Sequence, residues 1–287
     1  MFRLLPRRFV HIARTLTCAV VCLSSLCAAA APQPTVETIG GRKVESVTLR
    51  HPASPYVLVF EGGSRGTIDK WGQVLEAAGR DATVFAYNRP GYGNSDAVAT
   101  PRDGRTVVEE LRQVLRQKGL KPPYVLVGHS LGGLYMQWFA RAYPDEVKGL
   151  VLVDAMYPRA IKRTADFPWA VRLAGWTLFS RSVWREIEAI DATGEAVLAL
   201  PSIDDKPIVR LINEPKAHPG EAPPIALDLG VFRDDPATID LIRNLYPKAR
   251  TVTVDSDHQM PLATPNVVVD AIHEVITTLS APRSAGR

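Results

Sequence analysis

The sequence has little cysteine, and all of it lies near the N-terminus. Cys18, Cys22 and Cys27 are the only cysteines among 287 residues. The chain after residue 27 therefore has neither a disulfide nor a thiol nucleophile. Its histidines and carboxylates do not fall at the spacings of metal ligands, and it has no Walker A or dinucleotide-binding fingerprint. We expect no metal site and no bound cofactor.

An excess of charge of one sign is also missing once the N-terminus is set aside. The whole chain has a formal net charge of +4, from 34 basic and 30 acidic residues. Residues 1–31 hold four arginines and no lysine, aspartate or glutamate, which leaves 30 basic residues against 30 acidic ones. Binding to nucleic acid needs a basic surface, so we expect no nucleic-acid partner.

The apolar run near the N-terminus, Leu16–Leu26, is too short to span a bilayer, which takes about 20 residues. Four arginines precede it and an alanine run follows it at residues 28–31. This order is typical of a secretory signal peptide with an A-x-A cleavage site. We expect residues 1–31 to be a signal peptide, and the mature protein to be periplasmic or secreted without a stable membrane anchor.

The expected cleavage fixes where the mature chain begins. Its N-terminus should lie between Ala30 and Pro32, because Pro32 directly follows the alanine run. Intact-mass analysis of the exported protein measures this position, and exported protein that still carries Met1 would contradict it.

The remaining chain alternates between two apolar patterns. A hairpin is expected around Gly40-Gly41, followed by short continuous apolar runs that are typical of strands buried on both faces. Between these runs, apolar residues recur at spacings of three and four, as in amphipathic helices. The apolar runs are 56–60, 83–87, 124–127, 149–153, 207–212 and 251–254. The sequence predicts an α/β fold with a mostly parallel central sheet and helices on both faces.

Residues 155–206 interrupt this alternation with a helical, aromatic-rich segment that holds three of the five tryptophans. We interpret it as a helical cap inserted after the sixth strand. The core is then formed by residues 32–154 and 207–287. Trp169, Trp176 and Trp184 are expected to line or roof a pocket for an apolar substrate group.

The residues Gly128–Gly133 contain the pattern G-x-S-x-G. They follow the apolar run Tyr124–Val127 and precede the helical stretch Leu134–Tyr143. In that context the pattern indicates a nucleophile elbow, in which glycines make room for a sharp turn that exposes the serine hydroxyl. Ser130 is the predicted nucleophile.

On these residues the chain resembles the α/β-hydrolase superfamily over nearly all of its mature length. Tyr87–Ser95 is similar to the family's D-R-P-G-x-G-x-S turn, with Asn88 in place of the aspartate. Gly149–Asp154 resembles the sixth strand, and His258–Ile276 resembles the final histidine loop and helix. The resemblance implies the α/β-hydrolase fold and hydrolysis through a serine nucleophile.

A serine hydroxyl needs a general base, and the resemblance implies His258. The sequence leaves open which carboxylate orients this histidine. The family's usual position, after the seventh strand, holds Lys216. We favour Asp154, at the position of a known variant after the sixth strand, with Glu214 or another carboxylate such as Asp255 as alternatives.

Two backbone N–H groups are needed to stabilise the oxyanion. Leu131, the residue after the nucleophile, supplies one by the logic of the fold. The loop from Phe60 to Gly66 resembles the family's H-G-x turn, with Glu61 replacing histidine. This resemblance implies that Gly63 supplies the second N–H.

The sequence therefore predicts a serine hydrolase that cleaves carboxylic esters of small or medium hydrophobic acyl groups through an acyl-enzyme. The expected partner is a small acyl substrate. A proline-iminopeptidase-like enzyme, a lactone or amide hydrolase, an acyltransferase and a non-catalytic ligand-binding protein on the same fold are the alternatives. The sequence does not indicate an oligomeric state.

Overall fold

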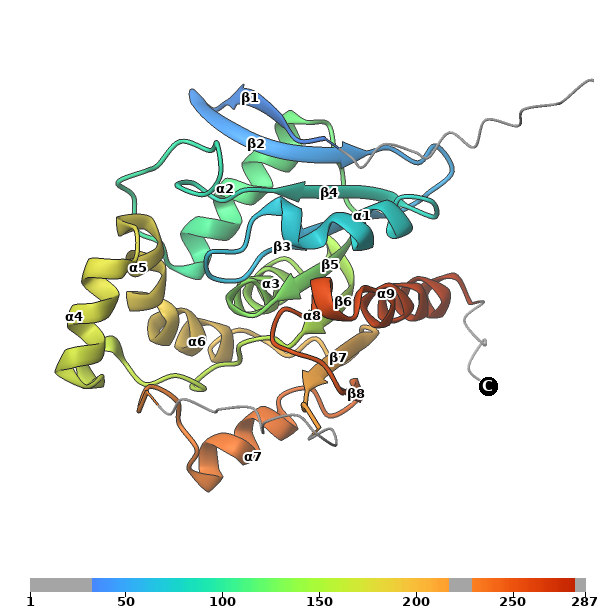
Figure 1. Cartoon of the computed structure of the whole chain (residues 1–287). Coiled ribbons are helices and arrows are strands. Elements are labelled where there is room, and N and C mark those ends of the chain that lie inside the picture. Colours follow the sequence, from blue (N-terminus) through green and yellow to red (C-terminus); the bar gives the residue numbers. More distant parts are fainter. Residues whose placement is uncertain (1–32, 217–228, 282–287) are drawn as a thin grey trace, which may run out of the picture. The chain divides into compact units, whose positions relative to one another are not determined.

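The computed structural model describes residues 33–216 and 229–281 (Figure 1). The predicted signal peptide and its cleavage site fall outside this part of the chain. Within the described residues, no helix combines the length and apolar character that crossing a membrane requires.

The fold is built on an eight-stranded sheet with the order β1-β2-β4-β3-β5-β6-β7-β8. Its N-terminal strands form the predicted hairpin, and both residues of the turn, Gly40 and Gly41, have the positive φ angles that glycine adopts without strain. The hairpin pairs antiparallel to β4, and all strands from β4 to β8 run parallel. The strands are β1 Thr35–Ile39, β2 Arg42–Leu49, β3 Val57–Glu61, β4 Thr83–Tyr87, β5 Tyr124–His129, β6 Val147–Val153, β7 Ile208–Asn213 and β8 Arg250–Val254.

Helices cover both faces of the sheet, as predicted. Strand side chains alternate between two apolar cores: Val57 and Val59 of β3 point into one, and Leu58 and Phe60 into the other. The first core contains residues of α2 (Gly104–Gln117) and α3 (Leu131–Ala142). The second is covered by α1 (Gly72–Ala78), preceded by the 3₁₀ turn η1 (Ile68–Trp71), and by α9 (Pro265–Ser280).

The segment between β6 and β7 is the helical cap. It contains the 3₁₀ turn η2 (Thr164–Asp166), α4 (Trp169–Leu178), α5 (Arg181–Glu188) and α6 (Ile190–Leu198). Helix α6 packs on α3, whereas α4 lies at the left-hand margin of the described part in Figure 1. Two further helices, α7 (Pro236–Asn244) and α8 (Met260–Ala263), flank β8 in the sequence.

Candidate active site

The turn between β5 and α3 holds Ser130 in a strained backbone conformation. Its φ of 52° and ψ of −124° are unfavourable for a residue with a side chain. Three backbone hydrogen bonds enforce this conformation: Ser130 N–H donates to the Val153 carbonyl, and the Ser130 carbonyl accepts from the N–H groups of Gly133 and Met156. The side chain is thereby presented at the N-terminal end of α3, where the helix dipole favours negative charge.

The glycines around Ser130 allow backbones to approach more closely than any side chain would permit. A Cβ atom on Gly132 would lie 2.5 Å from the Gly62 carbonyl oxygen, and one on Gly128 would lie 2.7 Å from the Cα of Gly133. Both distances are below those that real Cβ atoms show. The two glycines of the G-x-S-x-G pattern are therefore required by the geometry of the turn.

Three predicted site residues, from three different loops, form a hydrogen-bonded chain. The Nε2 of His258 lies 3.0 Å from the Oγ of Ser130. The Nδ1 of the same ring lies 2.6 Å from the Oδ2 of Asp154. Asp154 follows β6 and His258 follows β8, so parallel strands bring both residues to the same edge of the sheet as Ser130.

The carboxylate of Asp154 is fixed at both oxygens. Its second oxygen, Oδ1, accepts a hydrogen bond of 3.1 Å from the backbone N–H of Asn213 at the end of β7. The residue itself has a positive φ of 40°, which directs the chain away from β6 after the sheet ends. Of the two alternative acids, Asp255 accepts from the backbone N–H of Lys216, and Glu214 has an exposed side chain.

The loop after β3 brings Gly63 against the serine. A Cβ atom on Gly63 would lie 2.9 Å from the Cβ of Ser130 and 3.4 Å from its Oγ. Leu131 is the first residue of α3, and the N–H groups of a first helical turn have no acceptor within their own helix. The two residues predicted to form an oxyanion hole thus both lie next to Ser130, Leu131 as the following residue and Gly63 in the loop after β3.

A buried arginine holds this loop in place, and sequence reasoning did not identify it. The guanidinium of Arg89 donates to the carbonyl oxygens of Gly62 at 2.6 Å and Gly63 at 2.8 Å. It also forms ion pairs with Glu61 at 2.6 Å and, through two hydrogen bonds of 3.0 Å, with Glu186 of α5. All three charged side chains are at most 1% exposed.

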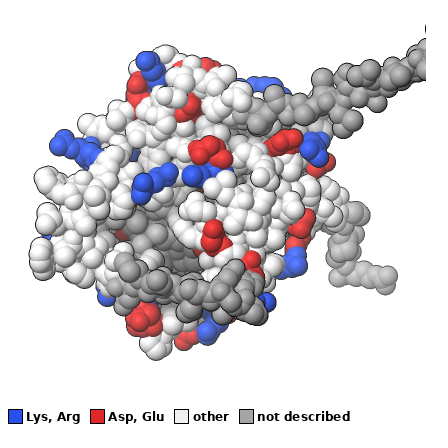
Figure 2. All heavy atoms as spheres, viewed as in Figure 1, with Lys and Arg blue, Asp and Glu red and all other residues white. Residues whose placement is uncertain are grey.

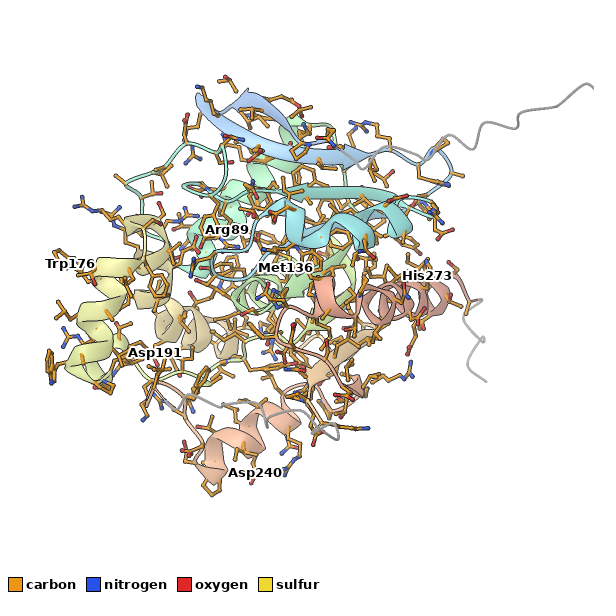
Figure 3. All side chains as sticks on the ribbon, in the orientation of Figure 1. Arg89, Met136, Trp176, Asp191, Asp240 and His273 are labelled. Atoms are coloured by element: carbon orange, nitrogen blue, oxygen red, sulfur yellow. The ribbon has the colours of Figure 1, made fainter. Side chains whose placement is uncertain are left out.

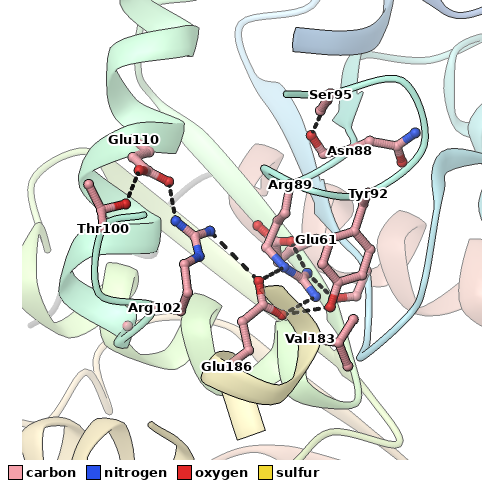
Figure 4. Close-up of polar contacts among 12 residues, drawn as sticks. Glu61, Asn88, Arg89, Tyr92, Ser95, Thr100, Arg102, Glu110, Val183 and Glu186 are labelled. Atoms are coloured by element: carbon pink, nitrogen blue, oxygen red, sulfur yellow. Dashed lines mark hydrogen bonds and ion pairs between the residues drawn. The ribbon is translucent and has the colours of Figure 1, made fainter. Parts of the chain in front are cut away.

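The network extends from the loop to the cap, as Figure 4 shows. Glu186 accepts a further hydrogen bond of 2.7 Å from the Tyr92 hydroxyl and lies 3.7 Å from Arg102. Arg102 in turn pairs with Glu110 of α2 at 2.6 Å. Buried charges are costly unless they are paired, and here each carboxylate has an arginine partner. The network therefore ties α5 of the cap to the loop that carries Gly63.

His129, the residue before the serine, supports the other side of the site. Its Nε2 lies 2.6 Å from the backbone carbonyl oxygen of His258. A carbonyl only accepts, so Nε2 carries the proton and donates. Burial, together with the nearby His258, lowers the pKa of His129 to about 4, which keeps the ring neutral near pH 7. His129 is thus positioned to hold the loop of His258.

The lowered pKa of His129 predicts a loss of stability in acid. Between pH 6.5 and 4 the unfolded chain binds a proton at this histidine that the folded chain does not bind, so the free energy of unfolding decreases as the pH falls. The expected decrease from this residue between pH 7 and 4 is about 3 kcal/mol. Urea unfolding at a series of pH values measures it.

The matched variant is His129→Gln, which keeps a side-chain donor and removes the titration. Its unfolding free energy should depend less steeply on pH over the same range. Equal pH dependence in the two proteins would contradict the assignment of a depressed pKa to His129.

The cap tryptophans do not occupy the predicted position. Trp169 and Trp176 are 76% and 70% exposed, and Trp176 points outward at the margin of the cap in Figure 3. Together with Trp184 they line an open groove of about 550 Å³ whose lining includes neither Ser130 nor His258. The prediction that Trp169 and Trp176 line or roof the acyl pocket is wrong, because α4 turns its apolar face away from the core.

No group of three or more histidine, cysteine, aspartate or glutamate side chains could hold a metal ion within residues 33–216 and 229–281. The chemistry that the arrangement around Ser130 can perform is attack by a hydroxyl on a carbonyl carbon, with a histidine to move the proton.

Comparison with known proteins gives one family and several partial relatives. Residues 55–182 match the family described as alpha/beta hydrolase fold. An uncharacterised protein of Schizosaccharomyces pombe is 39% identical over 87 residues, which are 30% of this chain and 16% of that protein. The human (lyso)-N-acylphosphatidylethanolamine lipase is 30% identical over 118 residues, covering 39% of this chain and 34% of the lipase. The chain thus spans well under half the length of these two relatives.

Solved structures share the fold across most of the chain. The enol-lactonase from Burkholderia xenovorans superposes with a TM-score of 0.64 at 15% identity, covering 85% of this chain and all of the lactonase chain. At this level of identity the similarity concerns the fold, and it carries over neither a substrate nor a mechanism.

Proposed function

We propose that the chain, whose residues 55–182 match the family described as alpha/beta hydrolase fold, is a serine hydrolase that cleaves carboxylic esters through an acyl-enzyme. The acyl groups are small or medium in size and hydrophobic. The observation that carries the proposal is the chain of hydrogen bonds from Asp154 through His258 to Ser130. Each heavy-atom distance in it is within hydrogen-bond reach, as general-base activation of a hydroxyl requires.

In the first half of the reaction, the Oγ of Ser130 forms a bond to the carbonyl carbon of the ester. The Nε2 of His258 accepts the hydroxyl proton, and Asp154 stabilises the imidazolium that results. The backbone N–H groups of Leu131 and Gly63 donate to the oxyanion of the tetrahedral intermediate. When that intermediate collapses, the bond to the alcohol oxygen breaks, and His258 returns the proton to the leaving alcohol.

In the second half, water attacks the acyl-enzyme. His258 accepts a proton from this water, and the bond between Oγ and the acyl carbon breaks as the proton returns to Ser130. The products are a carboxylic acid and an alcohol, and the enzyme is regenerated without any added oxidant or cofactor. The side chain of His258 is 54% exposed, which leaves it accessible to water for this step.

The proposal is tested by labelling the protein with a fluorophosphonate, mapping the modified residue by mass spectrometry, and measuring turnover of aryl esters of increasing acyl length. We expect the fluorophosphonate to modify one site, Ser130. In the turnover measurements we expect a burst of released phenol and a preference for short to medium acyl chains. Modification at another residue would contradict the assigned nucleophile. Turnover of lactones or amides, with none of esters, would keep the nucleophile and overturn the assigned substrate class.

A further inference from the structure

Helix α4 of the cap exposes an unusually apolar surface. Trp169, Leu173, Trp176 and Leu178 are between 52% and 79% exposed, and they lie within a single ten-residue helix. The first three are spaced by four and three residues, so they share one helical face. Surfaces of this kind on soluble proteins mark contacts with another molecule or with a membrane.

The opposite side of α4 explains why this face cannot turn inward. Gly175 is the buried residue of the helix, and its Cα packs directly on the ring of Trp184 in α5. A side chain at that position would collide with the ring. The close contact fixes the rotation of α4 about its own axis, which leaves Trp169, Leu173 and Trp176 directed away from the cap.

The charged residues within the segment that carries the apolar face are all basic. Between Phe167 and Arg185 the only charged residues are arginines, at 172, 181 and 185. Arg172 and Arg181 are exposed, and no ion pair joins any of the three to a carboxylate within the described chain. Arg172 lines the same groove as Trp169 and Trp176, which has one carboxylate, that of Glu188. The left margin of Figure 2, where α4 lies, is mostly uncharged.

Exposed tryptophans next to arginines that have no carboxylate partner in the described chain match the chemistry of a lipid surface. Indole rings favour the interface between lipid headgroups and acyl chains, and arginine pairs with phosphate. A second protein surface would also need to match the groove in shape, whereas a lipid surface adapts to it. We propose that α4 docks the protein on the surface of a bilayer that contains anionic phospholipid, with the apolar face in the headgroup region and the arginines at phosphates.

The proposal is independent of the chemistry at Ser130, and sedimentation with vesicles tests it. One set of vesicles is phosphatidylcholine alone, and the other contains about one-third phosphatidylglycerol. We expect the protein to bind the anionic vesicles and to lose binding as salt is raised. The double variant Trp169→Ala/Trp176→Ala should bind at least roughly tenfold more weakly, because its buried apolar area is smaller. Arg172→Glu/Arg181→Glu should lose the preference for anionic lipid.

The matched control is Ile239→Ala on α7, which removes an apolar side chain that is also exposed, outside α4. It should bind like the unaltered protein. All variants share residues 1–31, so differences between them report on α4. Unchanged circular dichroism and unchanged hydrolysis of a soluble aryl ester show that the variants are folded. Quenching by brominated lipid should affect Trp169 and Trp176, since Trp71 and Trp138 are buried.

Two outcomes overturn the proposal. In the first, the protein binds neither kind of vesicle, or the tryptophan variant binds as well as the unaltered protein. In the second, light scattering after size-exclusion chromatography shows a dimer that the tryptophan variant abolishes, without any binding to lipid. That result would assign the face to a second copy of the chain.

Discussion

Replacement of Ser130 by alanine is expected to reduce ester turnover by about 10⁶-fold, the size of effect seen when the nucleophile of a serine triad is removed. The loss is this large because the remaining groups, His258 and the two N–H donors, can only polarise the substrate for slow attack by water. Steady-state hydrolysis of an aryl ester and covalent labelling by a fluorophosphonate measure the two consequences, and both should disappear.

The substitution should leave the fold intact. The strained φ of 52° at position 130 costs alanine no more than serine, and the Cβ that packs against Gly63 is retained. The control is Ser256→Ala, which removes a hydroxyl near His258 in the sequence that forms a hydrogen bond with the Thr264 hydroxyl. That variant should be labelled normally. Full labelling of the Ser130→Ala protein would mean that the nucleophile is another residue.

Asp154→Asn is expected to lower kcat by about 10⁴-fold while the protein stays folded. The amide oxygen of asparagine can still accept from the Asn213 N–H, as Oδ1 does now. Its NH₂ group would then face Nδ1 of His258 and donate to it. Nε2 would carry the proton in that tautomer and could no longer accept one from Ser130. The pH dependence of kcat and the rate of fluorophosphonate labelling should both report the loss.

The matched comparison is Glu214→Gln, which also replaces a carboxylate by an amide of the same shape. Glu214 has an exposed side chain, so we expect its variant to remain within about tenfold of the unaltered enzyme. If Glu214→Gln abolished turnover while Asp154→Asn did not, Asp154 would be a structural residue at the end of its strand.

The elements that were predicted from the sequence are those whose signal is local. Continuous apolar runs located β3 to β8 to within about two residues. The physical reason holds for β3, β4 and β5, which are buried throughout and therefore apolar on both faces, whereas β8 at the edge of the sheet is mostly exposed. The G-x-S-x-G turn was equally clear, since its glycines are demanded by contacts within a few residues. One local signal was overlooked: Asp235-Pro236, a helix cap followed by proline, starts α7.

The features that were not predicted depend on contacts between distant parts of the chain. Arg89 and Glu186 are 97 residues apart, and neither residue by itself signals the other. The competition between Asp154 and Glu214 could not be decided because both follow strands that end at the same edge of the sheet. The cap tryptophans were misjudged for another reason: an apolar helix has the same composition whether its face meets a core or something outside the molecule.

The ion pairs of Glu186 have a mechanical consequence for the cap. Helix α5 is held to the core by the carboxylate of Glu186, which two arginines share, and moving the helix away would break the ion pairs of Glu186 with both Arg89 and Arg102. Within the described residues, helix α4 forms no ion pair with the core. It contacts α5, where Gly175 packs against the ring of Trp184. We therefore expect the cap to move as a flap that is fixed at α5 and free at α4. The part that moves carries the exposed tryptophans, whereas the fixed part holds the loop of Gly62 and Gly63 in place through Arg89.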